Sequence, residues 1–276
     1  MTIRLAGISV FPVKSTRGRS VDSAEVEPLG LVGDRRWMLV DVDGECLTAR
    51  TERNLLRLSA IDEGDRLLLH ADGTELAVPR PTGPMIEATV HGRPLHGIPA
   101  GQEAQRWVQQ TLGRGDVRLV HLGRPRALNP DYSRAGDATG FADAYPVTLA
   151  STASLRRLQD WVTETALDRG EEPTEIGMGR FRPNLVIDGD VAPFEEDSWT
   201  RVCVGDVAFD VAKPIDRCVL TTVHPDTLER GPEPIRTLAR HRAWDGRTWF
   251  GLQLIPRSTG TVRIGDDVVP RALPRA

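Results

Sequence analysis

Short apolar or alternating runs, interrupted by turn signals roughly every ten residues, dominate the first hundred residues of this chain. The turn signals include Asp43-Gly44, Asp72-Gly73 and Thr82-Gly83-Pro84, which favour reversals of the chain. The runs expected to form strands are Arg4–Val10, Arg36–Val42, Leu55–Ile61, Leu67–His70, Glu75–Val78 and Ile86–Val90. Short strands at this spacing are typical of an antiparallel barrel or sandwich.

Two stretches break this pattern, because their apolar residues recur at helical spacing. The first is AGQEAQRWVQQTLG, residues 100–113, where Gly113 is expected to cap the C-terminal end of a helix. The second is STASLRRLQDWVTETAL, residues 151–167, where Ser151 or Thr152 would serve as the N-cap. The sequence therefore predicts a mostly β protein of the α+β class with a few helices.

The remainder of the chain returns to short strands after a long polar stretch. Residues 123–144 are rich in Pro, Asp, Gly and Arg and are expected to form a surface loop or a domain junction. The further strands expected are Val117–Leu122, Asn184–Ile187, Arg201–Val204, Val207–Val211, Val219–Val223, Trp249–Ile255 and Thr261–Ile264. A chain of 276 residues suits two modest domains or one elaborated barrel. With the polar stretch as the junction, the predicted division is a β-barrel or sandwich domain over residues 1–122 and a second β domain with a few helices over residues 123–276.

The charge and hydropathy patterns argue against two classes of partner. Lysine and arginine together number 35 against 39 acidic residues, so the formal net charge is −4 and no basic face for a nucleic acid is expected. No apolar run approaches the ~18 residues that a membrane span requires. The alternating N-terminal stretch lacks the layout of a signal peptide, so a cytoplasmic location is expected.

The three cysteines are widely spaced and contain no CxxC pair. A disulfide scaffold, a zinc ribbon and a protein-ligated iron–sulfur cluster are therefore unexpected, and any redox chemistry must draw electrons from another protein. Cys46 and Cys203 are expected to pack in the interior, with Cys203 facing inward on an alternating strand. Of the 35 basic residues only Lys14 and Lys213 are lysines, and both lie in or beside segments considered next.

Four segments combine cationic, polar and glycine residues in a way that a plain β core does not require. They are FPVKSTRGRS with Lys14 and Ser15, GLVGDRRWML with Arg35 and Arg36, GMGRFRPNLVIDG with Arg180, Arg182 and Asn184, and PIDRCVLTTVHPDT with Asp216, Arg217 and Cys218. Together they offer several cations and amide donors for one anion, with a thiol nearby. Arg217 beside Cys218 favours the thiolate, a soft metal ligand or nucleophile, although a lone cysteine is more often a small core residue.

The same segments resemble the MOSC domain, the C-terminal domain of molybdenum-cofactor sulfurases, and the β-barrel domain that precedes it. The MOSC domain is indicated by FRPNLVIDG, FEEDSW, RCVLTTVHPDT and GDDVV. The preceding domain is indicated by FPVKSTRG, GLVGDRRWMLVD and LTARTERNLLRL. These seven motifs occur in the right order over nearly the whole chain, and the group that it resembles is the mitochondrial amidoxime-reducing component with its bacterial relatives.

The resemblance implies a pyranopterin molybdenum cofactor, with the metal held by the dithiolene of the pterin and by one protein cysteine. Carried over by motif, that cysteine is Cys218, and Arg217 would flank the metal. The residues implied to contact the phosphate end of the pterin are Lys14, Ser15 and Arg35 from the first domain and Ser151, Arg182 and Asn184 from the second. Arginine forks match phosphate oxygens, so this agrees with the interpretation from the residues alone.

The function that follows from the resemblance is reduction of small N-hydroxylated compounds, with oxygen transfer to molybdenum and electrons from a separate ferredoxin-, flavoprotein- or cytochrome-type protein. Asp216, where relatives carry a small residue, is the nearest acid for protonation and a candidate catalytic residue. A non-catalytic cofactor carrier and a sulfur-transfer protein acting through a Cys218 persulfide remain alternatives. His224 is expected to satisfy loop backbone at the surface.

Overall fold

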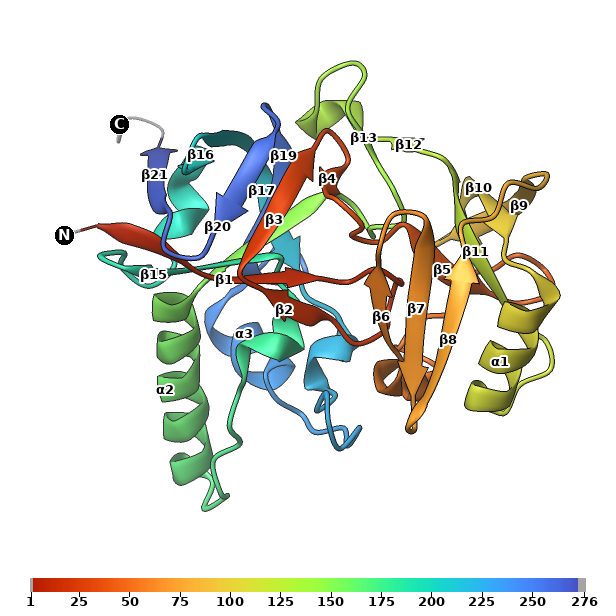
Figure 1. Ribbon diagram of the computed structural model, residues 1–276. Helices are drawn as coiled ribbons and strands as arrows, with labels where there is room; N and C mark the ends of the chain where they lie inside the picture. The colour runs from red at the N-terminus through yellow and green to blue at the C-terminus, as the bar shows by residue number, and fades with distance from the viewer. Residues whose placement is uncertain (1, 273–276) are drawn as a thin grey trace.

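The computed structural model describes residues 2–272, and its largest element is a closed seven-stranded β-barrel (Figure 1). The barrel closes because β14 pairs in parallel with β15 on one side and antiparallel with β19 on the other. In order around the barrel the strands are β14 (Val147–Ser151), β15 (Leu185–Gly189), β1 (Ile3–Val10), β21 (Asp267–Ala272), β16 (Trp199–Val204), β17 (Val207–Asp216) and β19 (Arg247–Pro256). Two short strands, β2 (Arg19–Val21) and β18 (Ala243–Trp244), pair with β1 and β19.

One face of each barrel strand fills the interior with aliphatic side chains. In β16 the buried residues Val202 and Val204 alternate with the half-buried Cys203. Because successive side chains of a strand point to opposite faces, Cys203 faces away from the interior, and the prediction that it faces inward is wrong. The interior residues include Leu5, Ile8, Leu149, Leu185, Val202, Phe209 and Leu252.

The first part of the chain adds a half-barrel with its own hydrophobic core. It contains a four-stranded sheet of β5 (Trp37–Val40), β11 (Arg118–Arg124), β10 (Arg93–Pro99) and β9 (Ile86–Val90), and a three-stranded sheet of β6 (Ser59–Asp62), β7 (Arg66–Ala71) and β8 (Thr74–Pro79). Helix α1 (Gln102–Leu112) packs on β11 and β8 through Val108 and Leu112. It ends at Gly113 with φ 64°, which confirms the predicted glycine cap.

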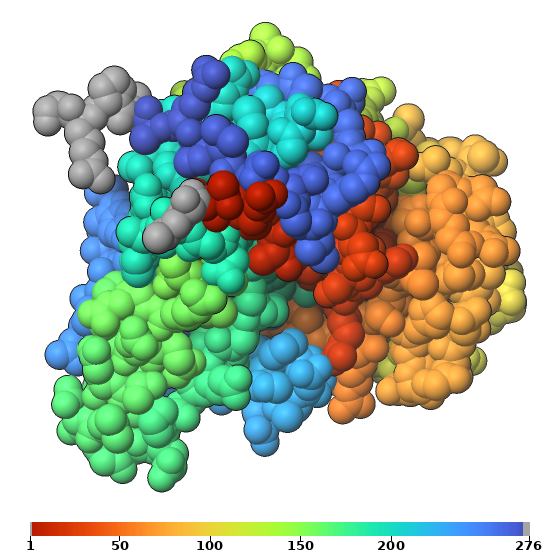
Figure 2. Space-filling view, turned by 60° about the vertical axis from the view of Figure 1, so that its left-hand side comes forward, coloured from red at the N-terminus to blue at the C-terminus, as the bar shows by residue number. Residues whose placement is uncertain are grey.

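Strands from before and after the boundary predicted at residue 122 pair with each other. Strand β1 lies between β15 and β21 of the barrel, and β3 (Ser23–Glu27) pairs with β20 (Gly260–Arg263) as well as with β4 (Gly30–Leu31). In Figure 2 the red segment at the start of the chain accordingly packs against the blue C-terminal strands, beside the orange half-barrel. The first 31 residues pack mainly with the second part of the chain, and the division into two domains at residue 122 stays a prediction.

Two helices cover one side of the barrel. Helix α2 (Thr152–Asp168) begins at Ser151, whose hydroxyl accepts a hydrogen bond from the backbone N–H of Ala153 at 3.2 Å, as the sequence predicts for its N-cap. Helix α3 (Ile235–His241) packs on α2 and β19. Beneath them the rings of Phe181 and Phe250 stack at 4.0 Å. None of the helices in the described part of the chain is long and apolar enough to span a membrane.

Five 3₁₀ turns complete the fold of residues 2–272, and the first and the last of them contain residues that the sequence predicts as strand. They are η1 (Arg53–Arg57), η2 (Pro130–Tyr132), η3 (Met178–Phe181), η4 (Glu195–Ser198) and η5 (Val219–Thr222). Residues 219–222 form η5 because the hydroxyls of Thr221 and Thr222 donate to carbonyls three residues earlier, at 3.0 and 2.7 Å, which favours a turn over a β-ladder. Within the predicted loop 123–144, η2 is accompanied by the small hairpin of β12 (Arg126–Ala127) and β13 (Ala138–Thr139).

Candidate functional site

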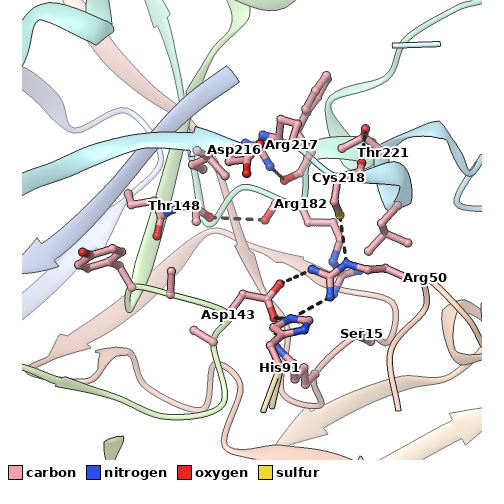
Figure 3. A pocket seen from close by; sticks show the side chains of 18 of the residues that line it. Ser15, Arg50, His91, Asp143, Thr148, Arg182, Asp216, Arg217, Cys218 and Thr221 are labelled. Atoms are coloured by element: carbon pink, nitrogen blue, oxygen red, sulfur yellow. Dashed lines mark hydrogen bonds and ion pairs between the residues drawn. The ribbon is translucent and has the colours of Figure 1, made fainter. Parts of the chain in front are cut away.

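A cleft of about 380 Å³ lies where the barrel meets the half-barrel, and arginines dominate its wall (Figure 3). Eight cationic side chains line it against two carboxylates, those of Asp143 and Asp216. The cationic residues are Lys14, Arg35, Arg50, Arg180, Arg182, Lys213, Arg217 and Arg247. A concave site with this excess of positive charge is complementary to an anion, although the chain as a whole is acidic.

Cys218 is the only cysteine in the cleft wall, and an arginine from the half-barrel reaches it. It lies between the end of β17 and the start of η5. The Nε of Arg50 donates to Cys218 Sγ at 3.2 Å, and the Nη2 of Arg50 donates to Asp143 Oδ2 at 2.9 Å (Figure 3). The Nη1 of Arg50 lies 2.9 Å from His91 Nε2. A cysteine sulfur that a guanidinium donor holds in place can serve as a ligand for a soft metal.

Asp143 forms ion pairs with the basic side chains on the half-barrel side of the cleft. Lys14 pairs with Asp143 and also donates to the carbonyl of Phe141 at 2.9 Å. Burial alone would raise the pKa of Asp143, but the charge of Lys14, a hydrogen bond from His91 and the charge of Arg50 hold it well below its usual range. Asp143 is therefore ionised at neutral pH and neutralises part of this positive charge.

Arg217 is held rigidly and keeps one donor free. Its Nε donates to the carbonyl of Phe250 at 2.8 Å and its Nη1 to the carbonyl of Phe181 at 2.9 Å. Its Nη2 is buried and finds no hydrogen-bond partner within residues 2–272. Burial lowers the pKa of Arg217 to about 9, so the fold holds this cation at a cost in desolvation. A Cβ on Gly251, whose φ is 74°, would lie 3.2 Å from this nitrogen, so the glycine preserves the space around it.

Arg182 and Arg35, which both line the cleft, lie over the same aromatic ring. Their guanidinium carbons lie 4.2 and 4.7 Å from the ring centroid of Phe11. Burial, and then the like charge of Arg35, lower the pKa of Arg182 to about 9. Two cations on one ring repel each other, and an anion bound between them would relieve that repulsion.

Asn184 lies behind Arg35. It is fully buried and does not line the cleft. Its Oδ1 accepts from Arg35 Nη1 at 3.1 Å and from the backbone N–H and hydroxyl of Thr148 at 3.1 and 3.0 Å. Its Nδ2 donates to the carbonyl of Ser9 at 3.1 Å and to Asp34 Oδ1 at 3.0 Å. Asn184 therefore orients Arg35, and its predicted direct contact with a cofactor stays a prediction.

The structure brings most of the other predicted site residues to the cleft. Ser15, with φ 66°, and the exposed Asp216 line it, and Asp216 Oδ2 lies 3.7 Å from Arg247 Nε. Ser151 is the exception, because it is fully buried as the cap of α2 and lies outside the cleft wall. His224 accepts at Nδ1 from the backbone N–H groups of the next loop residues, both at 3.2 Å, which confirms its predicted role.

Sequence reasoning missed Arg50, His91 and Asp143, which surround the sulfur and the buried lysine. Arg50 lies in the LTARTERNLLRL motif and His91 on the tip of the β9–β10 hairpin, where its φ of 52° suits a tight turn. A charged residue in a motif quoted for the family was the available signal for Arg50. The other two carried no signal that distinguishes them from solvated surface groups.

The fold and the cleft together define a β-barrel protein that presents one cysteine among clustered arginines. Residues 2–115 match the family model of the MOSC N-terminal beta barrel domain, and residues 136–269 match that of the MOSC domain. The chain belongs to the MOSC-domain family that includes the mitochondrial amidoxime-reducing components.

Individual relatives agree with this assignment. Mitochondrial amidoxime-reducing component 1 of Mus musculus is 34% identical over 286 residues, which cover 96% of this chain and 81% of that protein. The Homo sapiens protein of the same name is 33% identical, with 96% and 82% covered. The molybdenum cofactor sulfurase of Drosophila mojavensis is 30% identical over 91% of this chain, but the match spans only 32% of that longer protein.

Proposed function

We propose that this chain is a molybdenum-cofactor-dependent reductase of small N-hydroxylated compounds. In the reaction the N–O bond of an amidoxime or hydroxylamine breaks, two electrons and two protons are taken up, and the amidine or amine leaves with one water. A separate electron-transfer protein supplies the electrons. The observation that carries the proposal is the buried Nη2 of Arg217, which has no partner within residues 2–272, on the residue that precedes Cys218 in a cleft lined by eight cations.

The side chains present fit an anionic pyranopterin cofactor with a phosphate and a soft metal. Cys218 would hold the metal, and no cluster of three or more His, Cys, Asp or Glu within residues 2–272 offers a protein-only metal site. The phosphate would be held by Lys14, Ser15, Arg35 and Arg182, and Arg217 would donate through its free nitrogen. The cofactor, when bound, supplies the two-electron oxygen transfer that no side chain can perform.

The chain's own residues then have separate tasks. Arg50 fixes the position of the Cys218 sulfur through a single N–H donor, while Asp143 fixes Arg50 in turn. Asn184 and Asp34 hold Arg35 against Phe11. These contacts preorganise the cations before the anion arrives, so that little ordering is required on binding.

Turnover of benzamidoxime to benzamidine tests the proposed activity directly. The protein is produced in a host that makes the cofactor, its molybdenum is quantified by elemental analysis, and reduced methyl viologen replaces the natural electron donor. We expect molybdenum-dependent formation of benzamidine. Stoichiometric molybdenum without turnover of benzamidoxime or of an N-alkylhydroxylamine would instead identify a cofactor carrier, and absence of molybdenum in a folded protein would refute both.

Asp216 is the proposed proton donor to the departing oxygen. It ends β17 two residues before Cys218, and its partly exposed carboxylate meets only the guanidinium of Arg247 at 3.7 Å within the described chain. Asp216→Asn is expected to lower kcat for benzamidoxime by about 100-fold with unchanged molybdenum content, since general acids commonly contribute this much. Steady-state kinetics across pH measure the effect, and Asp226→Asn, at an exposed aspartate outside the cleft, is the control. Full turnover by Asp216→Asn would dispose of the assignment.

A further inference from the structure

Lys213 lies at the end of the cleft away from the cysteine, in a row of polar residues set by the strand register. On β17 it is the partner of Gln253 on β19, and Gln253 is in turn the partner of Thr148 on β14. All three residues line the cleft. Figure 3 shows Thr148 on the opposite side of Arg182 and Asp143 from Cys218. The row therefore forms a separate end of the same cavity.

The charge of Lys213 is not neutralised by the protein. Its Nζ lies 5.1 Å from the ring centroid of Tyr132 and 6.0 Å from that of Tyr145, within the range of cation–π contact. No carboxylate within residues 2–272 forms an ion pair with it, whereas Lys14, the other lysine of the chain, pairs with Asp143. Two rings thus position the ammonium group of Lys213 while its charge stays available.

Two further groups beside Lys213 can donate hydrogen bonds. Tyr145 is 4% exposed, and its hydroxyl is buried without a partner within residues 2–272. Gln253 is 7% exposed and presents a side-chain amide to the cleft. A buried hydroxyl without a partner is unusual in folded proteins and points to a group that the protein itself does not supply. Lys213, Gln253 and Tyr145 together therefore offer one cation and two neutral donors.

We propose that Lys213, Gln253 and Tyr145 form a subsite for the carboxylate of an anionic N-hydroxylated substrate, an inference that rests on the proposed function. A carboxylate has two acceptor oxygens and one charge, which match one ammonium and two neutral donors. A phosphate is better matched by the arginine forks of the opposite wall. Lys213 and Asp216 lie on the same bulged strand, which at ~3.3 Å per residue places their Cα atoms at most about 10 Å apart. A substrate held by its carboxylate at Lys213 thus extends its N-hydroxyl group toward Asp216 and Cys218.

The test compares 4-carboxybenzamidoxime with neutral benzamidoxime on the molybdenum-loaded protein. We expect the carboxylate probe to have a KM about tenfold lower than the neutral one, as befits one charge-assisted hydrogen bond. Lys213→Met should abolish this preference, and Lys213→Arg should restore most of it. Arg169→Met removes one positive charge at the exposed end of α2 and is the matched control, with the preference retained.

A binding measurement separates this inference from the proposed function. Calorimetric titration with the product analogue 4-carboxybenzamidine should give about tenfold weaker binding for Lys213→Met than for the parent protein, with equal molybdenum contents. Loss of molybdenum in Lys213→Met would place Lys213 in the cofactor site and overturn the subsite. Equal affinity of the parent protein for 4-carboxybenzamidine and benzamidine would also overturn it. Lys213-dependent binding without turnover of either amidoxime would uphold the subsite and refute the reductase.

Discussion

Replacing Cys218 by serine is expected to remove nearly all molybdenum from the purified protein and to lower amidoxime reduction by more than about 100-fold. A serine hydroxyl is a harder ligand than a thiolate and does not match a soft metal. It also replaces the sulfur that Arg50 contacts at 3.2 Å by a smaller oxygen on a shorter bond. Elemental analysis of parent and variant, both from a host that makes the cofactor, measures the metal.

Cys203→Ser is the matched control for this experiment. Cys203 is half-buried on the outer face of β16, outside the cleft, so its variant should keep both metal and activity. Thermal unfolding of Cys218→Ser without ligand should match the parent closely, because Cys218 is also only half-buried. Equal molybdenum contents in parent and Cys218→Ser would return Cys218 to the ordinary role of a packed residue.

Asn184→Ala is expected to lower the free energy of unfolding by about 3–5 kcal/mol. The truncation leaves the backbone N–H of Thr148 without its acceptor and takes one donor from the buried Asp34. Each buried polar group left without a partner costs about 1–3 kcal/mol. Urea denaturation of the protein without cofactor measures the change, and molybdenum content should fall as well, since Arg35 loses its anchor.

Asn54→Ala provides the comparison, because Asn54 is an exposed asparagine of η1 and its loss should change stability by less than about 0.5 kcal/mol. If Asn184→Ala lost metal while keeping its full stability, Asn184 would act by direct contact with the cofactor. That outcome would contradict the scaffold role that its five hydrogen bonds indicate.

Secondary structure was predictable where the sequence signal for it lies within one short stretch of the chain. The α1 helix with its cap at Gly113 and the α2 helix with its cap at Ser151 both follow from side-chain spacing and cap residues within one stretch of chain. Val219–Val223 was wrongly predicted as a strand, because β-branched residues favour strands in general. There the threonine hydroxyls satisfy the backbone of a 3₁₀ turn instead.

The site was predictable to the extent that its residues stand in motifs. Lys14, Arg35, Arg182 and Arg217 do converge on the cleft with Cys218. Their individual partners were not predictable, since each depends on tertiary contacts. Arg50 and Cys218, for example, are 168 residues apart in the sequence. Ser151 and Asn184 lie outside the cleft wall, because motif membership does not distinguish a residue in the wall of a site from one that supports it.

The place of β1 in the barrel also determines when the protein can fold as it is made. Ile3 lies opposite both Gly189 and Val268, so β1 pairs with two strands that are translated much later, one of which is β21. At ~5–20 residues per second, β1 waits roughly ten to fifty seconds for Val268 to be synthesised. The half-barrel strands lie between residues 37 and 124 and can assemble during that time. Barrel closure, and with it the cleft, comes after translation of the last strand.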